Sequence, residues 1–340
     1  LYAGYEAFAA MSLDSRLADR LREAAIEDYA AARQRFTTHG YDKFPHMMEH
    51  TYNTSHSLTR AVMSWAASQM FRLTGDKRYA DDAAASARYL LRCQATGAKS
   101  PLLNGYFYRD STKSVPVHFI HQSRDQMFAM ALVELCKTQP RNADFAAWRK
   151  SLTLHARHLK ALMPYTSPYK MLPSGIWKTR EYDDSDGFDR LHLFAPDNAR
   201  ELYDKQLSLG ERIDDNHYLR RFPIWFSIFN GNEAILLSTA KAAALMGNYL
   251  GDRQLAQIGL DQLYWTVGHN PFAQSLIYGE GHRYPSLDSF SSGEITGAMP
   301  VGIRAQTDAD APYWPSTDNA CYKEVWVTTA GKWLSLLAEY

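Results

Sequence analysis

Apolar residues recur at three- and four-residue spacing through segment after segment of this chain, which is the period of an amphipathic α-helix. Three boundary signals support these helices. Asp14-Ser15 can cap one helix, Gly75-Asp76 separates two others, and Asn270-Pro271 ends another because proline cannot continue a helix. Most of the helices follow one another as antiparallel pairs. The predicted helices span residues 2–12, 14–36, 55–74, 78–94, 122–138, 142–162, 217–229, 231–249, 252–268 and 323–339.

Long segments rich in glycine, proline and aromatic residues separate these helices. Residues 101–118 and 164–200 carry short β-like runs, and residues 272–321 have no helical period. Loops longer than about 15 residues are commonly functional, and these are too aromatic to be disordered linkers. The pattern predicts an all-α fold, an (α/α)6-type barrel or toroid of helical hairpins. The helix count falls one or two short of six pairs, so we expect the first helix or two to be missing.

The charge balance and the aromatic content indicate what kind of partner the chain has. Lysine and arginine number 37 and so do aspartate and glutamate, so we expect neither nucleic acid nor a membrane surface as a partner. The 21 Tyr and 8 Trp can stack on sugar rings and also hydrogen-bond to them, although most such residues lie in protein cores. These features favour a poly- or oligosaccharide substrate.

The length and the first residues give an expectation about domain organisation. A chain of 340 residues can bury one large core, and we expect a single catalytic domain over residues 1–340. The chain begins Leu1-Tyr2, with neither an initiator Met nor a signal sequence. We therefore expect a mature or truncated product, the C-terminal part of a longer protein with an upstream domain, in a secreted or periplasmic location.

A polar loop follows the apolar helix that ends at Gly268-His269-Asn270-Pro271. In this loop His282 and Arg283 stand beside Gly279 and Gly281. Glycines let a backbone bend close to a ligand, and His and Arg donate hydrogen bonds to sugar hydroxyls or to a carboxylate. We predict that His269, His282 and Arg283 bind substrate.

Glu324 stands at the head of the last predicted helix. A glutamate in a first helical turn also suits the helix dipole, so this position has a purely structural explanation. The aromatic residues Trp314, Tyr322 and Trp326 near it favour a catalytic role, because apolar walls raise the pKa of a carboxyl group toward the value that a general acid needs. Trp314 and Tyr322 are predicted to line the substrate site.

The last 80 or so residues resemble the C-terminal part of the glycoside hydrolase family 9 catalytic domain. The resemblance rests on Gln262-Leu263, Gly268, Asn270-Pro271, Ser275, Gly279, His282-Arg283, Gly297 through Gly302, and Glu324-Val325. It implies an (α/α)6 barrel, inverting hydrolysis of β-linked glucans and, often, bound calcium. It places Glu324 on the family's general acid and His282-Arg283 on its substrate-binding pair.

The family's Asp-Ala-Gly-Asp motif, whose aspartates activate the attacking water, occurs nowhere in this chain, and Lys323 replaces the usual Asn. Either the motif lies upstream or the chain performs different chemistry. Candidates for the missing catalytic role are Asp125, Asp214 and Asp215. A cluster of six polar residues, His121 to Gln126, opens an otherwise apolar helix, which is more than capping requires. Within this cluster His121 and Asp125 are predicted to be catalytic and Arg124 to bind substrate.

Two further groups complete the predicted site. Tyr52 and His56 are interpreted as pocket-lining residues, in preference to a zinc site built on His46 and His50. The run from Asp183 to Asp189 holds closely spaced carboxylates around a glycine; it predicts a structural Ca²⁺ held by Asp184, Asp186 and Asp189, with a solvated acidic loop as the alternative. Trp177 could place that loop at the rim of the cleft.

Three functions fit these residues. The first is inverting hydrolysis of a glycosidic bond with Glu324 as general acid, which needs no cofactor for its chemistry. The second is a polysaccharide lyase in which His, Tyr and Arg act beside a uronate. The third is a non-catalytic sugar-binding domain.

Overall fold

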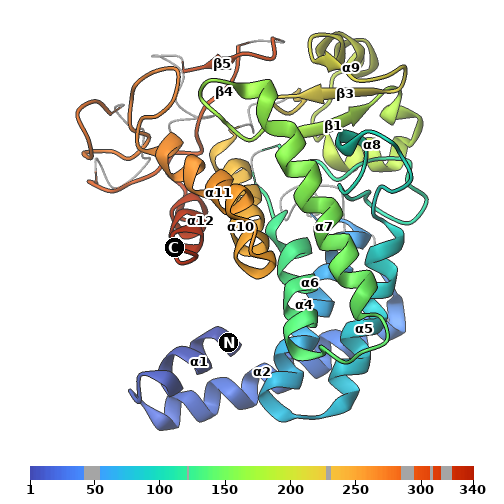
Figure 1. Cartoon of the computed structure of the whole chain (residues 1–340), viewed down its shortest axis with the longest axis vertical. Coiled ribbons are helices and arrows are strands. Elements are labelled where there is room, and N and C mark those ends of the chain that lie inside the picture. The colour runs from blue at the N-terminus through green and yellow to red at the C-terminus, as the bar shows by residue number, and fades with distance from the viewer. Residues whose placement is uncertain (42–53, 121, 227–230, 285–294, 307–308, 315–323) are drawn as a thin grey trace.

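The computed structural model describes residues 1–41, 54–120, 122–226, 231–284, 295–306, 309–314 and 324–340. Helical hairpins account for most of them (Figure 1). The paired helices are α1 (Tyr2–Ala10) with α2 (Ser15–His39), α4 (His56–Thr74) with α5 (Lys77–Arg92), α6 (Gln126–Thr138) with α7 (Phe145–Leu162), and α10 (Glu233–Leu250) with α11 (Arg253–Thr266); α12 (Val327–Leu337) closes the chain.

The turns of the hairpins follow from local sequence. Ser55 begins α4 by accepting a hydrogen bond from the Leu58 amide at 3.1 Å, and Asp76 begins α5 by accepting one from the Arg78 amide at 2.9 Å. Between α4 and α5, Gly75 adopts the left-handed conformation, with φ of 72°. Asp14 caps α2 through the Leu17 amide at 3.0 Å, as the sequence predicts.

The hairpins pack as two rows of helices. Helices α4, α6, α10 and α12 lie side by side as an inner row, and α5, α7 and α11 lie behind them as an outer row. The main apolar core runs between the two rows and includes Leu58, Phe128, Trp148 and Leu237. The all-α prediction of (α/α)6-type helical hairpins is therefore confirmed, and the long loops carry the short β segments expected of them.

The segment between α7 and α10 departs from the prediction. The helix expected at residues 217–229 is wrong: His217–Arg220 form β3, which pairs antiparallel with β1 (Gly175–Lys178) and with β2 (Glu211–Arg212). The local apolar content fits a helix or a strand, and pairing with β1 decides for the strand. The same region contains two helices that the sequence did not predict, α8 (Ser185–Leu191) and α9 (Ala199–Ser208), and a second small sheet joins β4 (Arg304–Ala305) to β5 (Pro312–Tyr313).

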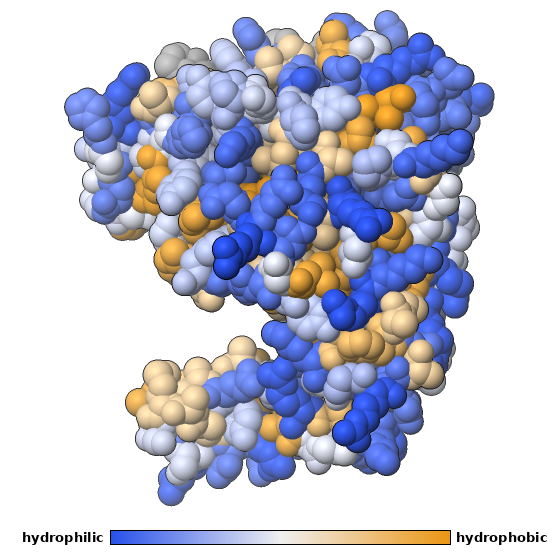
Figure 2. Space-filling view, viewed as in Figure 1, coloured by the Kyte–Doolittle hydropathy of each residue, from blue (hydrophilic) through white to orange (hydrophobic). Residues whose placement is uncertain are grey.

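The space-filling view shows a deep notch between the N-terminal hairpin and the body of the molecule (Figure 2). The hairpin α1–α2 contacts the body mainly through a small cluster around Tyr2, Ala25 and Met70. In the part of the chain that the structure describes, no helix has the length and apolar character needed to span a membrane.

Candidate functional site

The inner helices all run in the same direction. In each hairpin the outer helix returns antiparallel to its inner partner, and α12 runs parallel to α10, since Lys241 bonds to Ser335 and Asn248, farther along α10, bonds to Glu339. Short turns therefore lie at one end of the rows and long loops at the other (Figure 1). The first residues of α4, α6, α10 and α12 all lie at the loop end.

Three predicted site residues stand at these helix starts. His56 begins α4, Asp125 directly precedes α6, and Glu324 lies three residues before α12. His56 and Glu324 are 268 positions apart in the sequence. The common direction of the inner helices nevertheless brings all three residues to the loop end of the helix rows.

Glu324 lies before the last helix and not within it. That helix begins at Val327, and Glu324 occupies an extended segment whose backbone carbonyl accepts a hydrogen bond from the Val301 amide at 2.9 Å. The helix-dipole explanation for Glu324 is therefore wrong. Val301 also packs against Trp314 and Trp326, so two of the predicted aromatic residues lie beside the segment that carries Glu324.

Glu233 is a carboxylate of this end that the sequence prediction missed. Its side chain is fully buried, and its Oε1 accepts a hydrogen bond from the Thr266 hydroxyl at 2.6 Å while Oε2 has no partner. Burial raises the pKa of Glu233 to about 7. Its amide donates to the carbonyl of Val301 at 3.0 Å, so Val301 links the backbones of Glu233 and Glu324.

The packing around Glu233 leaves no room for another side chain. A Cβ atom at Gly302 would lie 2.5 Å from the Cβ of Glu233, and Gly302 has a φ of 99°. A glycine is therefore required where this loop crosses the start of α10. The signal for Glu233 in the sequence is a lone carboxylate before the apolar run Ala234 to Leu237.

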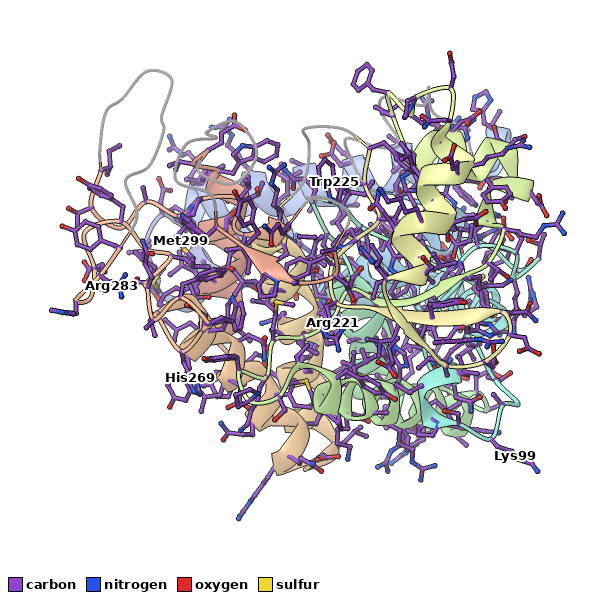
Figure 3. The ribbon with its side chains drawn as sticks, turned by 90° about the horizontal axis from the view of Figure 1, so that it is seen from above. Lys99, Arg221, Trp225, His269, Arg283 and Met299 are labelled. Atoms are coloured by element: carbon purple, nitrogen blue, oxygen red, sulfur yellow. The ribbon has the colours of Figure 1, made fainter. Side chains whose placement is uncertain are left out.

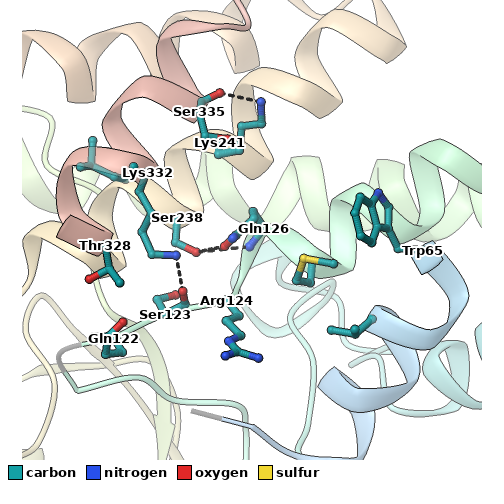
Figure 4. A pocket seen from close by; sticks show the side chains of 14 residues that line it. Trp65, Gln122, Ser123, Arg124, Gln126, Ser238, Lys241, Thr328, Lys332 and Ser335 are labelled. Carbon is teal, nitrogen blue, oxygen red and sulfur yellow. Dashed lines mark hydrogen bonds between the residues drawn. The ribbon is translucent and has the colours of Figure 1, made fainter. Parts of the chain in front are cut away.

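Four residues of the predicted polar cluster, Gln122, Ser123, Arg124 and Gln126, line a cavity of about 440 Å³ between the inner helices, which we call the inner-face cavity (Figure 4). Lys332 of α12 crosses it and donates a hydrogen bond to the carbonyl of Ser123. Ser238 of α10 donates to the side chain of Gln126. The remaining described lining residues are Val62, Trp65, Met127, Leu237, Lys241, Thr328, Gly331 and Ser335.

Asp125 belongs to a different, smaller cavity of about 50 Å³ behind this one, between α6, α7 and α10. Burial raises the pKa of Asp125 to about 6, while a hydrogen bond from Thr239 and the charge of Lys332 act in the opposite direction. His155 and His158 line the same cavity, and burial lowers their pKa values to about 3 and about 4, so both are neutral at pH 7. Neither histidine was predicted as a site residue, and both look like core positions in the helical pattern.

His56 and two of the predicted calcium ligands line a third cavity, of about 800 Å³. The His56 ring stacks between Tyr41 and Tyr89, at centroid distances of 5.0 and 4.1 Å, and its Nδ1 lies 2.8 Å from the Tyr89 hydroxyl. Burial, and then the charge of Arg60, lower the pKa of His56 to about 4, so the ring is neutral at pH 7.

Two of the three predicted calcium ligands are engaged with protein groups. Asp184 caps α8 through the Gly187 amide at 3.1 Å, and Asp186 pairs with Arg190 at 3.1 Å. Asp189 is exposed and does not line that cavity. Within the described ranges no three His, Cys, Asp or Glu side chains are grouped so that they could hold a metal ion. The calcium prediction therefore rests on the sequence pattern alone.

The predicted sugar-binding loop lies at the edge of the molecule. His269, His282 and Arg283 are exposed, and Figure 3 shows Arg283 and His269 at one side, away from Arg221 and Trp225. The carbonyl of Arg283 accepts a hydrogen bond from the Ser275 amide at 2.7 Å, which closes the loop. These side chains are accessible to a ligand, and none of them lines the inner-face cavity.

Two predicted residues are placed where they cannot act as predicted. Trp177 is fully buried, stacked on His118 at 3.5 Å, so it presents no face to a sugar. Its place on β1 explains this, because alternate β1 residues face the smaller core around α8 and α9.

The side chain of Asp215 is 91% exposed and pairs with Arg212 at 2.5 Å. It lines none of the three cavities. Asp214 lies in the turn between β2 and β3 and not at the start of a helix, and its carboxylate bonds to His217 at 2.8 Å. Of the predicted residues, Tyr52, His121 and Tyr322 lie outside the described residues.

Comparison with known proteins gives only distant likenesses. No protein-family model and no curated protein matches the chain. Among solved structures, the cellulase Cel9M of C. cellulolyticum aligns at 12% identity and a TM-score of 0.31, and its complex with cellobiose at 15% and 0.33; each covers 84% of this chain. The catalytic domain of Clostridium thermocellum CelT aligns at 15% identity and a TM-score of 0.31 over 83% of this chain. The chain spans 64%, 64% and 59% of those three chains, and TM-scores this low carry no argument about its function.

Proposed function

We propose that the protein is a carbohydrate-active enzyme that cleaves glycosidic bonds in a poly- or oligosaccharide. The observation that carries this proposal is the common loop end of the four inner helices, where Glu324 lies in a segment flanked by Trp314 and Trp326, just before α12, whose residues Thr328 and Lys332 line a polar cavity. Ionisable side chains and aromatic faces near polar cavities are typical of sites that bind and cleave sugars.

The form of cleavage that we propose first is family 9-type inverting hydrolysis with Glu324 as the general acid. Inversion requires a second carboxylate about 6.5–9.5 Å away, which activates a water on the opposite face of the sugar. Among the predicted candidates for that base, Asp125 directly precedes the inner helix α6, whereas Asp215 lies exposed in the turn between β2 and β3. The carboxyl group of Asp125 faces the smaller cavity. We therefore propose Glu324 as the general acid with more support than Asp125 has as the general base.

The test of this proposal is Glu324→Gln, which keeps the size of the side chain and removes its proton. General acid catalysis contributes about 10²–10⁴-fold, so we expect the turnover of a cleaved oligosaccharide to fall by roughly a hundredfold or more. Glu201→Gln, on the exposed face of α9, is the matched control and should keep full turnover. A loss of less than about tenfold in Glu324→Gln would remove the general-acid role.

The inner-face cavity favours a second candidate, a polysaccharide lyase. Arg124 could neutralise a uronate carboxylate there, and Lys332, whose pKa burial lowers to about 8, could take the neighbouring proton. The products separate the two candidates, because a lyase forms an unsaturated sugar that absorbs ultraviolet light and a hydrolase does not. Saturable binding with neither product would support a sugar-binding domain instead.

A further inference from the structure

A set of backbone hydrogen bonds connects the start of α10 to the segment that carries Glu324, and we call it the 299–303 ladder. Residues 299–303 lie in its middle and are bonded on both sides, so the start of α10 determines where the Glu324 backbone lies. The ladder has four amide-to-carbonyl bonds: Asn232 to Ile303 at 2.9 Å, Glu233 to Val301 at 3.0 Å, Val301 to Glu324 at 2.9 Å and Trp326 to Met299 at 3.3 Å.

The side chain of Glu233 is buried against this ladder with only one hydrogen bond to its carboxyl group. Oε1 accepts from the Thr266 hydroxyl at 2.6 Å, and in the part of the chain that the structure describes Oε2 has no partner. Gly302 passes so close that a Cβ atom there would lie 2.5 Å from the Cβ of Glu233. Solvation of the carboxyl group therefore requires residues 299–303 and the start of α10 to separate.

The protonated form of Glu233 suits this buried place better than the ionised form. Burial raises the pKa of Glu233 to about 7, and the Thr266 hydroxyl acts in the opposite direction. Glu324 and Arg304, the ionisable side chains of the neighbouring segments, are not among the causes of this shift. A solvated glutamate titrates near 4.5, so separation of the two segments becomes easier as the pH rises from about 4.5 to about 7, and no easier above that.

We propose that Glu233 is a positioning residue for Glu324: its protonated carboxyl group lets residues 299–303 pack closely on α10 and so holds the Glu324 backbone, and its ionisation loosens this packing. This inference rests on the proposed function, in which Glu324 is the general acid, and adds a control by pH. The Glu324 segment is held most firmly in acidic solution.

Hydrogen exchange of the Val301 and Trp326 amides in the full chain tests this inference. Each rate is divided by the intrinsic chemical rate at the same pH, which gives a protection factor. We expect protection of both amides to fall roughly 10- to 100-fold between about pH 5 and about pH 7.5 and then to stay level, since each pKa unit corresponds to a tenfold change in an equilibrium. The amides of α6 report opening of the core and should exchange more slowly than the ladder at every pH.

Two variants tie this pH dependence to the Glu233 carboxyl group. Glu233→Gln keeps the shape of the neutral acid and cannot ionise, so its ladder should be protected like the wild type near pH 5 and should keep that protection at pH 7.5. A merely structural role would instead lower protection at every pH. Thr266→Val removes the hydroxyl that lowers the pKa, so its decline should continue to a higher pH; this variant decides the question if Glu233→Gln fails to fold. Glu201→Gln, at an exposed position of α9, is the matched control and should behave like the wild type.

Turnover tests the link from the ladder to Glu324. Glu233→Gln should keep at about pH 7.5 a larger fraction of its turnover at about pH 5 than the wild type keeps. Equal fractions in the two proteins would overturn the positioning role.

The exchange experiment needs no substrate, so its outcome is separate from that of the proposed function. Ladder protection that does not change with pH, the same pH dependence in the wild type and in Glu233→Gln, or equal exchange of the ladder and α6 would overturn this inference even in an active enzyme. A ladder that responds as expected in a protein that cleaves no oligosaccharide would support the control by Glu233 and remove the enzymatic proposal.

Discussion

At the scale of single residues, the sequence identifies Asp125 as an unusual position, but it does not identify the cavity that the Asp125 carboxyl group enters. Its polar surroundings at residues 122–126 are visible in the sequence, and they do line a cavity. The carboxyl group itself points to the smaller cavity with His155 and His158. Which of two neighbouring cavities a side chain enters depends on its rotamer and on the helices packed around it. Local sequence specifies neither of these.

The raised pKa of Asp125 predicts a specific dependence of stability on pH. The unfolded carboxyl group titrates near 3.8 and the folded one at about 6, so folding holds the proton between these values. Stability contributed by this group is therefore greatest below about pH 4 and declines as the pH rises to about 6. Above that, the folded protein carries the full cost of the buried charge.

Asp125→Asn should therefore stabilise the protein at pH 7.5 and leave it unchanged near pH 4, as urea denaturation at about these two pH values would show. The gain is at most about 3 kcal/mol, since two pKa units correspond to roughly that amount. The control is Asp215→Asn, whose exposed side chain should change the free energy of unfolding by less than about 0.5 kcal/mol at either pH. Equal stability of wild type and Asp125→Asn at pH 7.5 would mean that the carboxyl group is not desolvated.

At the scale of single elements, the helix ends were the most reliable prediction and the segment at residues 217–220 the least. Caps at Asp14 and Asp76 and the break at Gly75 depend on side chains within three residues, so the sequence is sufficient. Residues 217–220 become a strand because β1, about forty positions earlier, offers hydrogen bonds. That pairing is a tertiary interaction, and a local pattern could not reveal it.

The N-terminal cap of α4 gives a prediction at this scale. The Ser55 hydroxyl is buried and accepts from the Leu58 amide, so Ser55→Ala leaves a buried donor without its partner. We expect a loss of about 1 kcal/mol in the free energy of unfolding. Ser208→Ala, at an exposed position near the end of α9, should lose less than about 0.5 kcal/mol in the same denaturation experiment. Equal losses in the two variants would show that the cap does not stabilise α4.

In the molecule as a whole, stability is distributed unevenly between the N-terminal hairpin and the helix rows. Only Ala18 and Ala25 are buried in the 25 residues of α2, whereas twelve of the 18 residues of α10 are buried. Segments with few buried apolar contacts open at lower free energy than the core. The expected single domain over residues 1–340 remains a prediction.

Hydrogen exchange of backbone amides would test this difference. We expect the amides of α1 and α2 to exchange well before those of α6 and α10, and the ion pair between Arg33 and Asp82 to be the main polar tie that slows them. Asp82→Asn should speed exchange in α2 and leave α10 unchanged. Exchange of both regions at one common rate would instead indicate a single cooperative unit.

The sequence by itself determined the helical hairpins, their caps and the polar character of the segments that join them, because these depend on contacts within a few residues or on a period of 3.6. Only the tertiary structure decided which of those polar residues share a site. The parallel inner helices bring His56, Asp125, Glu233 and Glu324 to one end, while the packing of β1 against α8 and α9 buries Trp177 and the turn between β2 and β3 leaves Asp215 in solvent. Burial and proximity are properties of the packed fold, and no local pattern in the chain specifies them.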